Sequence, residues 1–277
     1  MDVTNRRQLH ALIDLDGTMF KGSTRIEGAD ELIHAMLEWH VPFLFVTNNS
    51  SRSPEQVADV LQSMGIPAKA EDVLTSAQAA AHYISSKFTG KSVYMIGELG
   101  LRSALAEAGV EWTDQPQDVW QKRIDVVVQG IDRQFSYEKL EAAACAIRGG
   151  AAFVATNPDY MLPSDKGFSP GAGTLMAAIQ AASGTEPVLI GKPSSIIMKV
   201  ALERLNCQAE ETLVIGDNMM TDMLAGARAG CRTALVLTGV TTSNNLASYK
   251  EKSGVSPEIV CPHLHDMKKW LGIQLGR

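Results

Sequence analysis

Two pairs of closely spaced aspartates, one early and one late in the chain, are the side chains best suited to chemistry. Asp14 and Asp16 lie in residues 14–18 (DLDGT), and Asp217 is followed by Asp222. Two like charges roughly 4 Å apart repel by about 1 kcal/mol in water and about 4 kcal/mol at an effective dielectric constant of about 20. If the fold gathers these four acids, they need a countercharge. Hard carboxylate oxygens with few His or Cys nearby suit Mg²⁺.

Two further polar clusters hold groups that bind phosphate oxygens. Thr47, Asn48 and Asn49 supply a hydroxyl and two amides, and Lys192 supplies a cation. The negative charge of a phosphoryl group is spread over its oxygens. It is stabilised by a divalent metal, a lysine, a hydroxyl and backbone amides acting together. The combination of the acids with these clusters therefore indicates metal-dependent phosphoryl transfer.

Each cluster also has an ordinary structural explanation when it is taken alone. Asp-x-Asp-Gly occurs as a turn, and Thr-Asn-Asn occurs as a turn or a helix cap. A lone lysine is most simply solvated, and Asp217 could be the N-cap of the helix that follows it. The functional interpretation depends on all four clusters following strands in one chain.

The segments around the clusters predict the elements that position them. Short apolar runs alternate with segments of helical period, which is typical of an α/β protein with a mostly parallel sheet. The carboxyl ends of parallel strands form one edge of a sheet, and ligands bind there, so we expect the four clusters to converge. The expected strands are residues 11–13, 43–46, 188–190, 213–215 and 234–237, and the expected helices are residues 31–40, 54–64, 195–205 and 224–229.

The middle of the chain has strands and helices of its own. Strands are expected at residues 93–96, 126–128 and 153–155, and helices at about residues 100–108 and 137–148. This is enough material for a separate α/β domain. We therefore predict a Rossmann-like parallel-sheet core formed by residues 1–79 and 187–277, with an inserted α/β cap domain at residues 80–186.

The four clusters, taken in order, resemble the four motifs of the haloacid dehalogenase (HAD) superfamily. The motifs are residues 14–18, Thr47-Asn48, Lys192, and Asp217 with Asp222. The interval between the first two motifs leaves no room for a cap, whereas the long interval before Lys192 places a cap at the second insertion point. With residues 155–159 (ATNPD), this arrangement resembles the NagD or p-nitrophenylphosphatase branch, subfamily IIA, with a C2-type cap. The resemblance covers nearly the whole chain.

The resemblance implies a Mg²⁺-dependent phosphatase that acts on a small phosphorylated metabolite, such as a sugar phosphate or a nucleotide. Asp14 would be the nucleophile that forms an aspartyl-phosphate. Asp16 would protonate the leaving alkoxide and then deprotonate the attacking water. A phosphotransferase or mutase that uses the same intermediate is an alternative, and so is a catalytically idle binding protein that keeps the fold.

The resemblance also assigns roles to the remaining motif residues. Thr47, Asn48 and Asn49 would hold phosphoryl oxygens, and Lys192 would neutralise developing charge. The metal would be bound by the Asp14 carboxylate, the Asp16 backbone carbonyl and the Asp217 carboxylate. Two residues behind these ligands, Asp222 and Asn218, would orient a metal-bound water or Lys192.

Composition restricts the partners. The chain has 277 residues and a formal net charge of −6, which argues against a binder of nucleic-acid backbones. No apolar run is long enough to predict a membrane span, and residues 1–10 lack the apolar region of a secretory signal. The four cysteines form no CxxC pair, which favours reduced thiols in the cytoplasm. A homodimer through the cap is left open by the resemblance.

Overall fold

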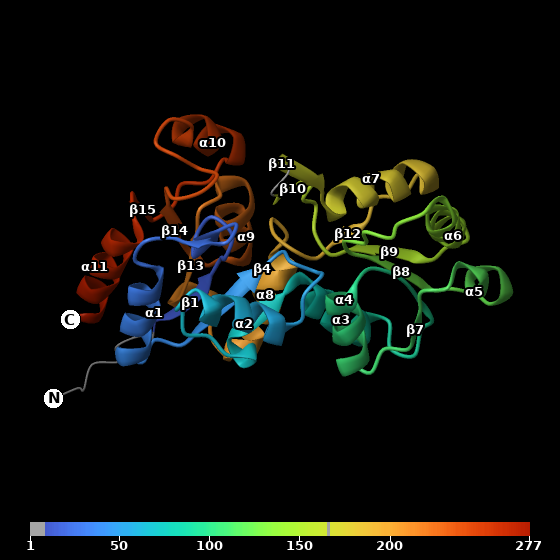
Figure 1. Ribbon diagram of the computed structural model, residues 1–277, viewed down its shortest axis with the longest axis horizontal. Helices are drawn as coiled ribbons and strands as arrows, with labels where there is room; N and C mark the ends of the chain where they lie inside the picture. The colour runs from blue at the N-terminus through green and yellow to red at the C-terminus, as the bar shows by residue number, and fades with distance from the viewer. Residues whose placement is uncertain (1–8, 165–166) are drawn as a thin grey trace. The chain divides into compact units, whose positions relative to one another are not determined.

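The computed structural model describes residues 9–164 and 167–277 (Figure 1). The chain forms two compact units. Unit 1 contains Met1–Val46, Ala58–Val73 and Pro193–Arg277, and unit 2 contains Thr47–Val57 and Leu74–Lys192. Most of the expected inserted segment lies in unit 2, together with residues 47–57. The domain boundaries near residues 80 and 186 stay a prediction.

A six-stranded sheet carries the acidic motifs. Its strand order is β15-β14-β13-β1-β4-β5, and β1 pairs in parallel with both β13 and β4. Every residue of β1 and β13 is buried, as expected for parallel strands that are covered on both faces. The α/β fold with parallel strands is therefore confirmed. The strands are β1 (His10–Ile13), β4 (Phe43–Thr47), β5 (Val73–Thr75), β13 (Thr212–Gly216), β14 (Arg232–Val236) and β15 (Ile259–Cys261).

The helices that flank these strands match the predicted ranges closely where a local cap marks their ends. The helix predicted at residues 195–205 is observed over the same residues, because the Ser194 hydroxyl accepts from Ile196 N at 3.3 Å and Asn206 turns left-handed. The first helix ends two residues earlier than predicted, since His40 has a φ of 56°. The helices are α1 (Ala29–Glu38), α2 (Pro54–Ser63), α8 (Ser195–Leu205), α9 (Leu224–Ala229), α10 (Leu246–Ser253) and α11 (Leu264–Leu275), with a short hairpin of β2 (Phe20–Lys21) and β3 (Thr24–Arg25).

Unit 2 contains a second parallel sheet, of five strands in the order β12-β9-β8-β6-β7. The strand expected at residues 188–190 is present, but it pairs with β9, with Val188 opposite Val154. It was expected in the sheet of Asp14, and that expectation was wrong because a short apolar run predicts a strand without naming its partner. The strands are β6 (Val93–Ile96), β7 (Trp112–Thr113), β8 (Val126–Gln129), β9 (Ala152–Ala155) and β12 (Val188–Leu189).

Helices and one hairpin complete unit 2. Tyr94, Val127, Phe153 and Ile179 belong to its apolar core, which packs the sheet against helices. The helix predicted at residues 137–148 is again observed over the same residues, because the Ser136 hydroxyl caps it. The elements are α3 (Ser76–Lys87), α4 (Leu99–Glu107), α5 (Pro116–Gln121), α6 (Tyr137–Arg148) and α7 (Ala172–Ser183), with the antiparallel pair β10 (Met161–Ser164) and β11 (Gly167–Pro170).

None of the helices within residues 9–164 and 167–277 combines the length and the apolar character that crossing a membrane requires.

Candidate active site

Asp14 stands at the end of β1, where the buried strand gives way to a turn. Its backbone N–H donates to Ile215 O at 2.9 Å, which keeps the residue in the ladder with β13. Its side chain is buried, and its Oδ2 accepts a hydrogen bond from the Thr18 hydroxyl at 3.1 Å. Asp16, two residues later, is exposed. The two acids of the first motif therefore have different environments, one fixed in the interior and one facing solvent.

Asp217 follows β13 and lies in the same small space as Asp14. Its Oδ1 is 3.3 Å from the Thr18 hydroxyl, so this hydroxyl is within hydrogen-bond distance of both carboxylates. Its Oδ2 accepts from Val240 N at 2.5 Å. The side chain is about 1% exposed, which means that the carboxylate is held almost entirely by protein groups.

Two glycines make room for the Asp217 carboxylate. Gly17 has a φ of +91°, and a Cβ at this position would lie 2.6 Å from Asp217 Oδ2. A Cβ on Gly239 would lie 2.0 Å from the same oxygen. Only a residue without a side chain fits at these positions, so the Asp-x-Asp-Gly turn has a packing function beside its chain reversal.

Asp222 reaches the same place from a π-helical turn at Met219–Met223. Its Oδ2 accepts from Asn218 N at 3.1 Å, while the Asn218 side chain caps the turn by accepting from Met220 N at 2.9 Å. A Cβ on Gly216 would lie 2.4 Å from the Cβ of Asp222. The π turn and the glycine together bring a carboxylate back toward the end of β13.

The three buried carboxylates of Asp14, Asp217 and Asp222 offer oxygens that all lie within 4.8 Å of one another. This confirms the expectation that Asp14 and Asp217 are close enough to share one cation. The structure adds the Asp222 carboxylate to the same group, whereas the sequence analysis placed it behind the ligands. An all-oxygen, buried and multiply charged donor set fits a hard divalent cation.

Sequence reasoning missed the loop after β14. The Thr238 hydroxyl donates to Gly17 O at 2.7 Å, and Thr241 N donates to Asp217 O at 3.0 Å. The Thr241 hydroxyl in turn accepts from Met219 N at 3.1 Å. These residues are polar and directly follow a strand, which is the same signal that identified the four motifs, so the pattern could have predicted a fifth cluster.

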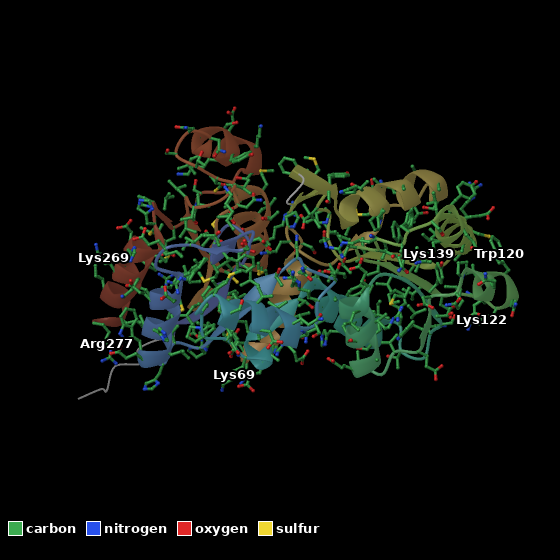
Figure 2. The ribbon with its side chains drawn as sticks, in the orientation of Figure 1. Lys69, Trp120, Lys122, Lys139, Lys269 and Arg277 are labelled. Atoms are coloured by element: carbon green, nitrogen blue, oxygen red, sulfur yellow. The ribbon has the colours of Figure 1, made fainter. Side chains whose placement is uncertain are left out.

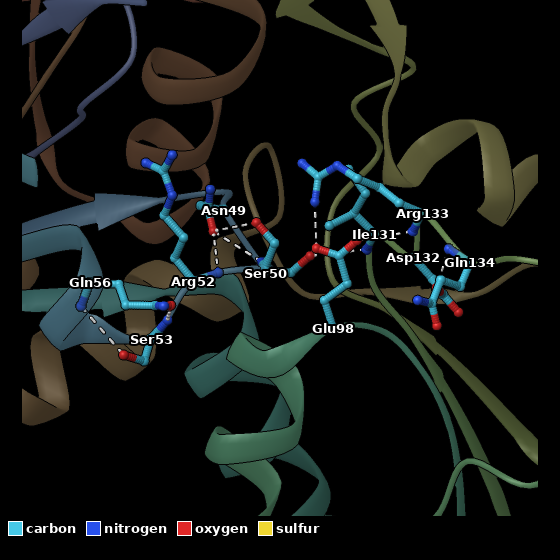
Figure 3. A network of polar contacts seen from close by, with 11 residues as sticks. Asn49, Ser50, Arg52, Ser53, Gln56, Glu98, Ile131, Asp132, Arg133 and Gln134 are labelled. Carbon is cyan, nitrogen blue, oxygen red and sulfur yellow. Dashed lines mark hydrogen bonds and ion pairs between the residues drawn. The ribbon is translucent and has the colours of Figure 1, made fainter. Parts of the chain in front are cut away.

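The remaining predicted residues lie in unit 2. Thr47 is buried, and its hydroxyl accepts from Asn49 N at 3.1 Å. The Asn49 side chain accepts from Ser51 N at 3.0 Å and from Arg52 N at 2.9 Å (Figure 3). The loop after β4 is therefore held by its own side chains.

Asn48 is bound within unit 2 by its side chain and its backbone. Its Nδ2 donates to Asp159 Oδ2 at 3.1 Å and to the backbone oxygen of Lys192 at 3.0 Å. Its carbonyl accepts from Asn157 Nδ2 at 2.8 Å and from the Ser76 hydroxyl at 2.7 Å. The structure thus joins Asn48 to the buried Lys192 segment and to residues 157–159, which the sequence placed in the inserted domain.

Comparisons with known proteins agree with the fold and the acidic cluster. Residues 11–111 match the family model described as haloacid dehalogenase-like hydrolase, and residues 189–267 match a second model, described as HAD-hydrolase-like. The chain is 46% identical over 241 residues to the 5'-nucleotidase YutF of Bacillus subtilis, covering 87% of this chain and 91% of that protein. It is 41% identical over 260 residues to the acid sugar phosphatase of Staphylococcus saprophyticus, covering 94% of this chain and 96% of the other.

A solved structure shows the same likeness in three dimensions. The p-nitrophenyl phosphatase from Archaeoglobus fulgidus superposes with a TM-score of 0.87 at 34% identity, covering 95% of this chain and 99% of the other. The chain belongs to the haloacid dehalogenase-like hydrolases, in the branch similar to NagD and the p-nitrophenylphosphatases. It is an enzyme of the phosphoric monoester hydrolase class.

Proposed function

We propose that this enzyme is a Mg²⁺-dependent phosphatase that hydrolyses a small phosphorylated metabolite through an aspartyl-phosphate on Asp14. The observation that carries the proposal is the group of three buried carboxylates within 4.8 Å, which includes Asp14, the residue that we propose as nucleophile. The names of the relatives, a 5'-nucleotidase and an acid sugar phosphatase, favour nucleotides and sugar phosphates as substrates.

In the first step an Asp14 carboxylate oxygen attacks phosphorus, and the bond from phosphorus to the ester oxygen breaks. Asp16 gives its proton to the departing alkoxide, and its exposure leaves the carboxyl accessible to a ligand outside the buried cluster. In the second step a water attacks phosphorus while the bond from phosphorus to the Asp14 oxygen breaks, Asp16 takes up the water's proton, and inorganic phosphate leaves. Asp14 is then restored as a carboxylate, so atoms and charge balance over the two steps.

The divalent cation, held by the Asp14 and Asp217 carboxylates and the Asp16 carbonyl, would supply positive charge that offsets the phosphoryl oxygens. Asp222 is close enough to act as a further ligand or to orient water beside the ion. Asn218 supports this residue from behind, because its backbone N–H donates to Asp222.

We further propose that the loop of Thr47, Asn48 and Asn49, together with Lys192, forms the phosphoryl-binding site. Both amide hydrogens of Asn48 are used within unit 2, on Asp159 and on the Lys192 backbone. We therefore expect the Asn48 side chain to hold the loop in shape, while the Thr47 hydroxyl and the Lys192 ammonium make the charge-stabilising contacts.

We also propose the cellular compartment and the partners of the enzyme. The four cysteines, Cys145, Cys207, Cys231 and Cys261, are all free thiols, which supports a reducing cytoplasm. Neither nucleic acid nor membrane is expected as a partner at a net charge of −6 with no basic run. A homodimer through the inserted domain stays a prediction.

The test uses purified protein with p-nitrophenyl phosphate, with Mg²⁺ or with EDTA, beside Asp14→Asn. We expect hydrolysis that stops when EDTA is added, returns when Mg²⁺ is in excess, and is absent in the variant. Hydrolysis that persists in Asp14→Asn would remove the nucleophile assignment. Fast transfer of phosphate to a sugar in place of water would favour a phosphotransferase.

A further inference from the structure

Unit 2 has a cavity of about 550 Å³ at the carboxyl ends of three strands of its own sheet. Gly97 and Glu98 follow β6, Asp114 follows β7, and Asp132 lies just after β8, and all four line the cavity. The chain runs from β6 to β7 on one side of β6 and then to β8 on the other side. The cavity therefore lies where the strand order reverses, which is the place where open parallel sheets bind ligands.

We propose that this cavity is a second binding site, for an uncharged polyhydroxylated molecule such as a free sugar or a nucleoside. None of the residues that line it belongs to the motifs assigned to phosphoryl transfer. The proposal goes beyond the phosphatase activity and does not depend on it.

Most of the charges that line the cavity are paired with one another, which favours a neutral ligand over an ion. Three cations each bind a carboxylate: Arg102 to Asp114 at 2.8 Å, Arg133 to Glu98 at 2.5 Å, and Lys139 to Asp132 at 2.6 Å. Figure 3 shows Arg133 against Glu98, and Lys139 is labelled in Figure 2. A phosphate would meet three cations that are each already bound to a carboxylate, and a cationic ligand would meet three carboxylates that are each already bound to a cation.

A neutral ligand with several hydroxyls can use the groups that remain. Each guanidinium has five N–H donors and each carboxylate has about four lone-pair positions, so an ion pair leaves both donors and acceptors available. Glu138, a fourth lining carboxylate, accepts from Gln117 Nε2 at 3.0 Å, which adds an amide to the wall. Vicinal hydroxyls of a sugar both donate and accept hydrogen bonds. They can therefore bind guanidinium donors and carboxylate acceptors that lie side by side on the cavity wall.

Asp114 has the position of a ribose-binding acid. In dinucleotide-binding sheets an acidic residue that follows the second strand of the unit accepts from ribose hydroxyls. Asp114 follows β7, the next strand after β6, and one of its oxygens accepts from Gln115 Nε2 at 2.6 Å.

The glycine turn between β6 and α4 differs from a phosphate-binding turn. Gly100 N donates to Ser51 O at 2.9 Å, and a Cβ at Gly100 would lie 2.5 Å from Arg52 O. The first turn of α4 is therefore covered by the chain at residues 51–52. The site keeps the sugar-binding part of a nucleotide site without the phosphate-binding part, which favours a sugar or a nucleoside over a nucleotide.

The walls of the cavity also hold the loop after β4. Ile131 N, between Gly130 and Asp132, donates to the Ser50 hydroxyl at 3.1 Å (Figure 3). The β6–α4 turn donates to Ser51 O, as described above. A ligand in the cavity therefore contacts the same two turns that fix residues 50 and 51.

The test is calorimetric titration of the full chain with D-ribose and, separately, with adenosine. We expect saturable binding of at least one probe to the wild type, and at least tenfold weaker binding to Asp114→Asn. Asp125→Asn is the matched control, because its carboxylate accepts from Ser92 N at 3.3 Å and does not line the cavity. We expect Asp125→Asn to bind like the wild type.

Hydrogen exchange locates the bound probe. We expect slower amide exchange at residues 97–102 and 130–139 when the probe is bound. p-Nitrophenyl phosphate hydrolysis without sugar is expected to be unchanged in Asp114→Asn, which shows that this variant folds. The proposal is overturned if neither probe binds, if Asp114→Asn keeps wild-type affinity, or if the protected amides lie elsewhere.

Discussion

The two parallel sheets place acidic residues at their carboxyl edges in opposite ways. In unit 1, three buried carboxylates occupy one small space within 4.8 Å. In unit 2, the acids around the cavity are spread out, and three of them each bind an arginine or a lysine. Crowded oxygens attract a cation, whereas paired charges leave hydrogen-bonding capacity for a neutral molecule. The same sheet edge thus supports different chemistry according to how its charges are distributed.

The largest effect is expected from Asp14→Asn. The amide is a poor nucleophile and a weaker metal ligand, so kcat for p-nitrophenyl phosphate should fall by about 10⁴-fold or more. In EDTA the same variant should unfold at a higher temperature than the wild type, because one of three crowded charges is gone; the expected gain is about 1 kcal/mol. Thermal melts in EDTA check this second part. Lower stability of Asp14→Asn in EDTA would contradict the crowding of charge in unit 1.

Gly17→Ala tests whether the space around Asp217 matters for the metal. The added methyl group would meet the Asp217 carboxylate, and we expect Mg²⁺ affinity to fall by about 10–100-fold, as when the support of a metal ligand is lost. Gly22→Ala is the matched control, since Gly22 also has a positive φ, +60°, but no atom within 4 Å of the added Cβ. That variant should lose about 1 kcal/mol of stability and keep its Mg²⁺ affinity. If Gly17→Ala and Gly22→Ala lost the same Mg²⁺ affinity, the loss would be explained by backbone strain and the space around Asp217 would not matter.

Asp132→Asn tests the paired charges of unit 2. The buried Asp132 carboxylate accepts from Lys139 Nζ at 2.6 Å and from Gln134 N at 2.8 Å. Removing its charge leaves Lys139, itself only partly exposed, without its carboxylate. We expect the free energy of unfolding to fall by about 1–3 kcal/mol, a change opposite in sign to that of Asp14→Asn. Denaturant unfolding at pH 7 measures this change in the free energy of unfolding. A more stable Asp132→Asn would contradict the proposed difference between the carboxyl edges of the two sheets.

The smallest effect is expected at the surface pair of Arg232 and Glu258. The hydrogen bond from Arg232 at 2.8 Å lowers the pKa of the Glu258 carboxyl, and partial burial opposes this. A lowered folded-state pKa adds stability above the unfolded pKa, and this stability is lost as the pH falls through the folded value. Glu258→Gln should therefore cost no more than about 1 kcal/mol at pH 7, and the difference should shrink as the pH falls through the folded-state pKa of Glu258. A difference that grows toward acid pH would contradict this assignment.

Local signals in the sequence predicted much of the fold. The exact ends of α6 and α8 follow from serines that cap the first turn, and buried strands such as β1 are read from short apolar runs. Strand pairing depends on residues distant in the chain, so the sheet that β12 joins was mispredicted.

The candidate site was also predicted only in part, because some of its contacts join residues that are distant in the chain. Residue types and spacing indicated that Asp14 and Asp217 meet, and they do. The polar residues after β14 carry the same local signal as the motifs, but the contact of Gly239 and Thr241 with Asp217 depends on how that loop folds back, which no local pattern reveals. The use of the Asn48 amide on Asp159 likewise depends on a contact between segments far apart in sequence.

The most direct test of the account is a calorimetric titration of metal-free protein with Mg²⁺, in the wild type and in Asp217→Asn. We predict one saturable site per chain in the wild type and no measurable site in the variant, with p-nitrophenyl phosphate hydrolysis lost in parallel. Mg²⁺ binding of equal affinity and stoichiometry in Asp217→Asn would contradict the claim that the three gathered carboxylates form the metal site.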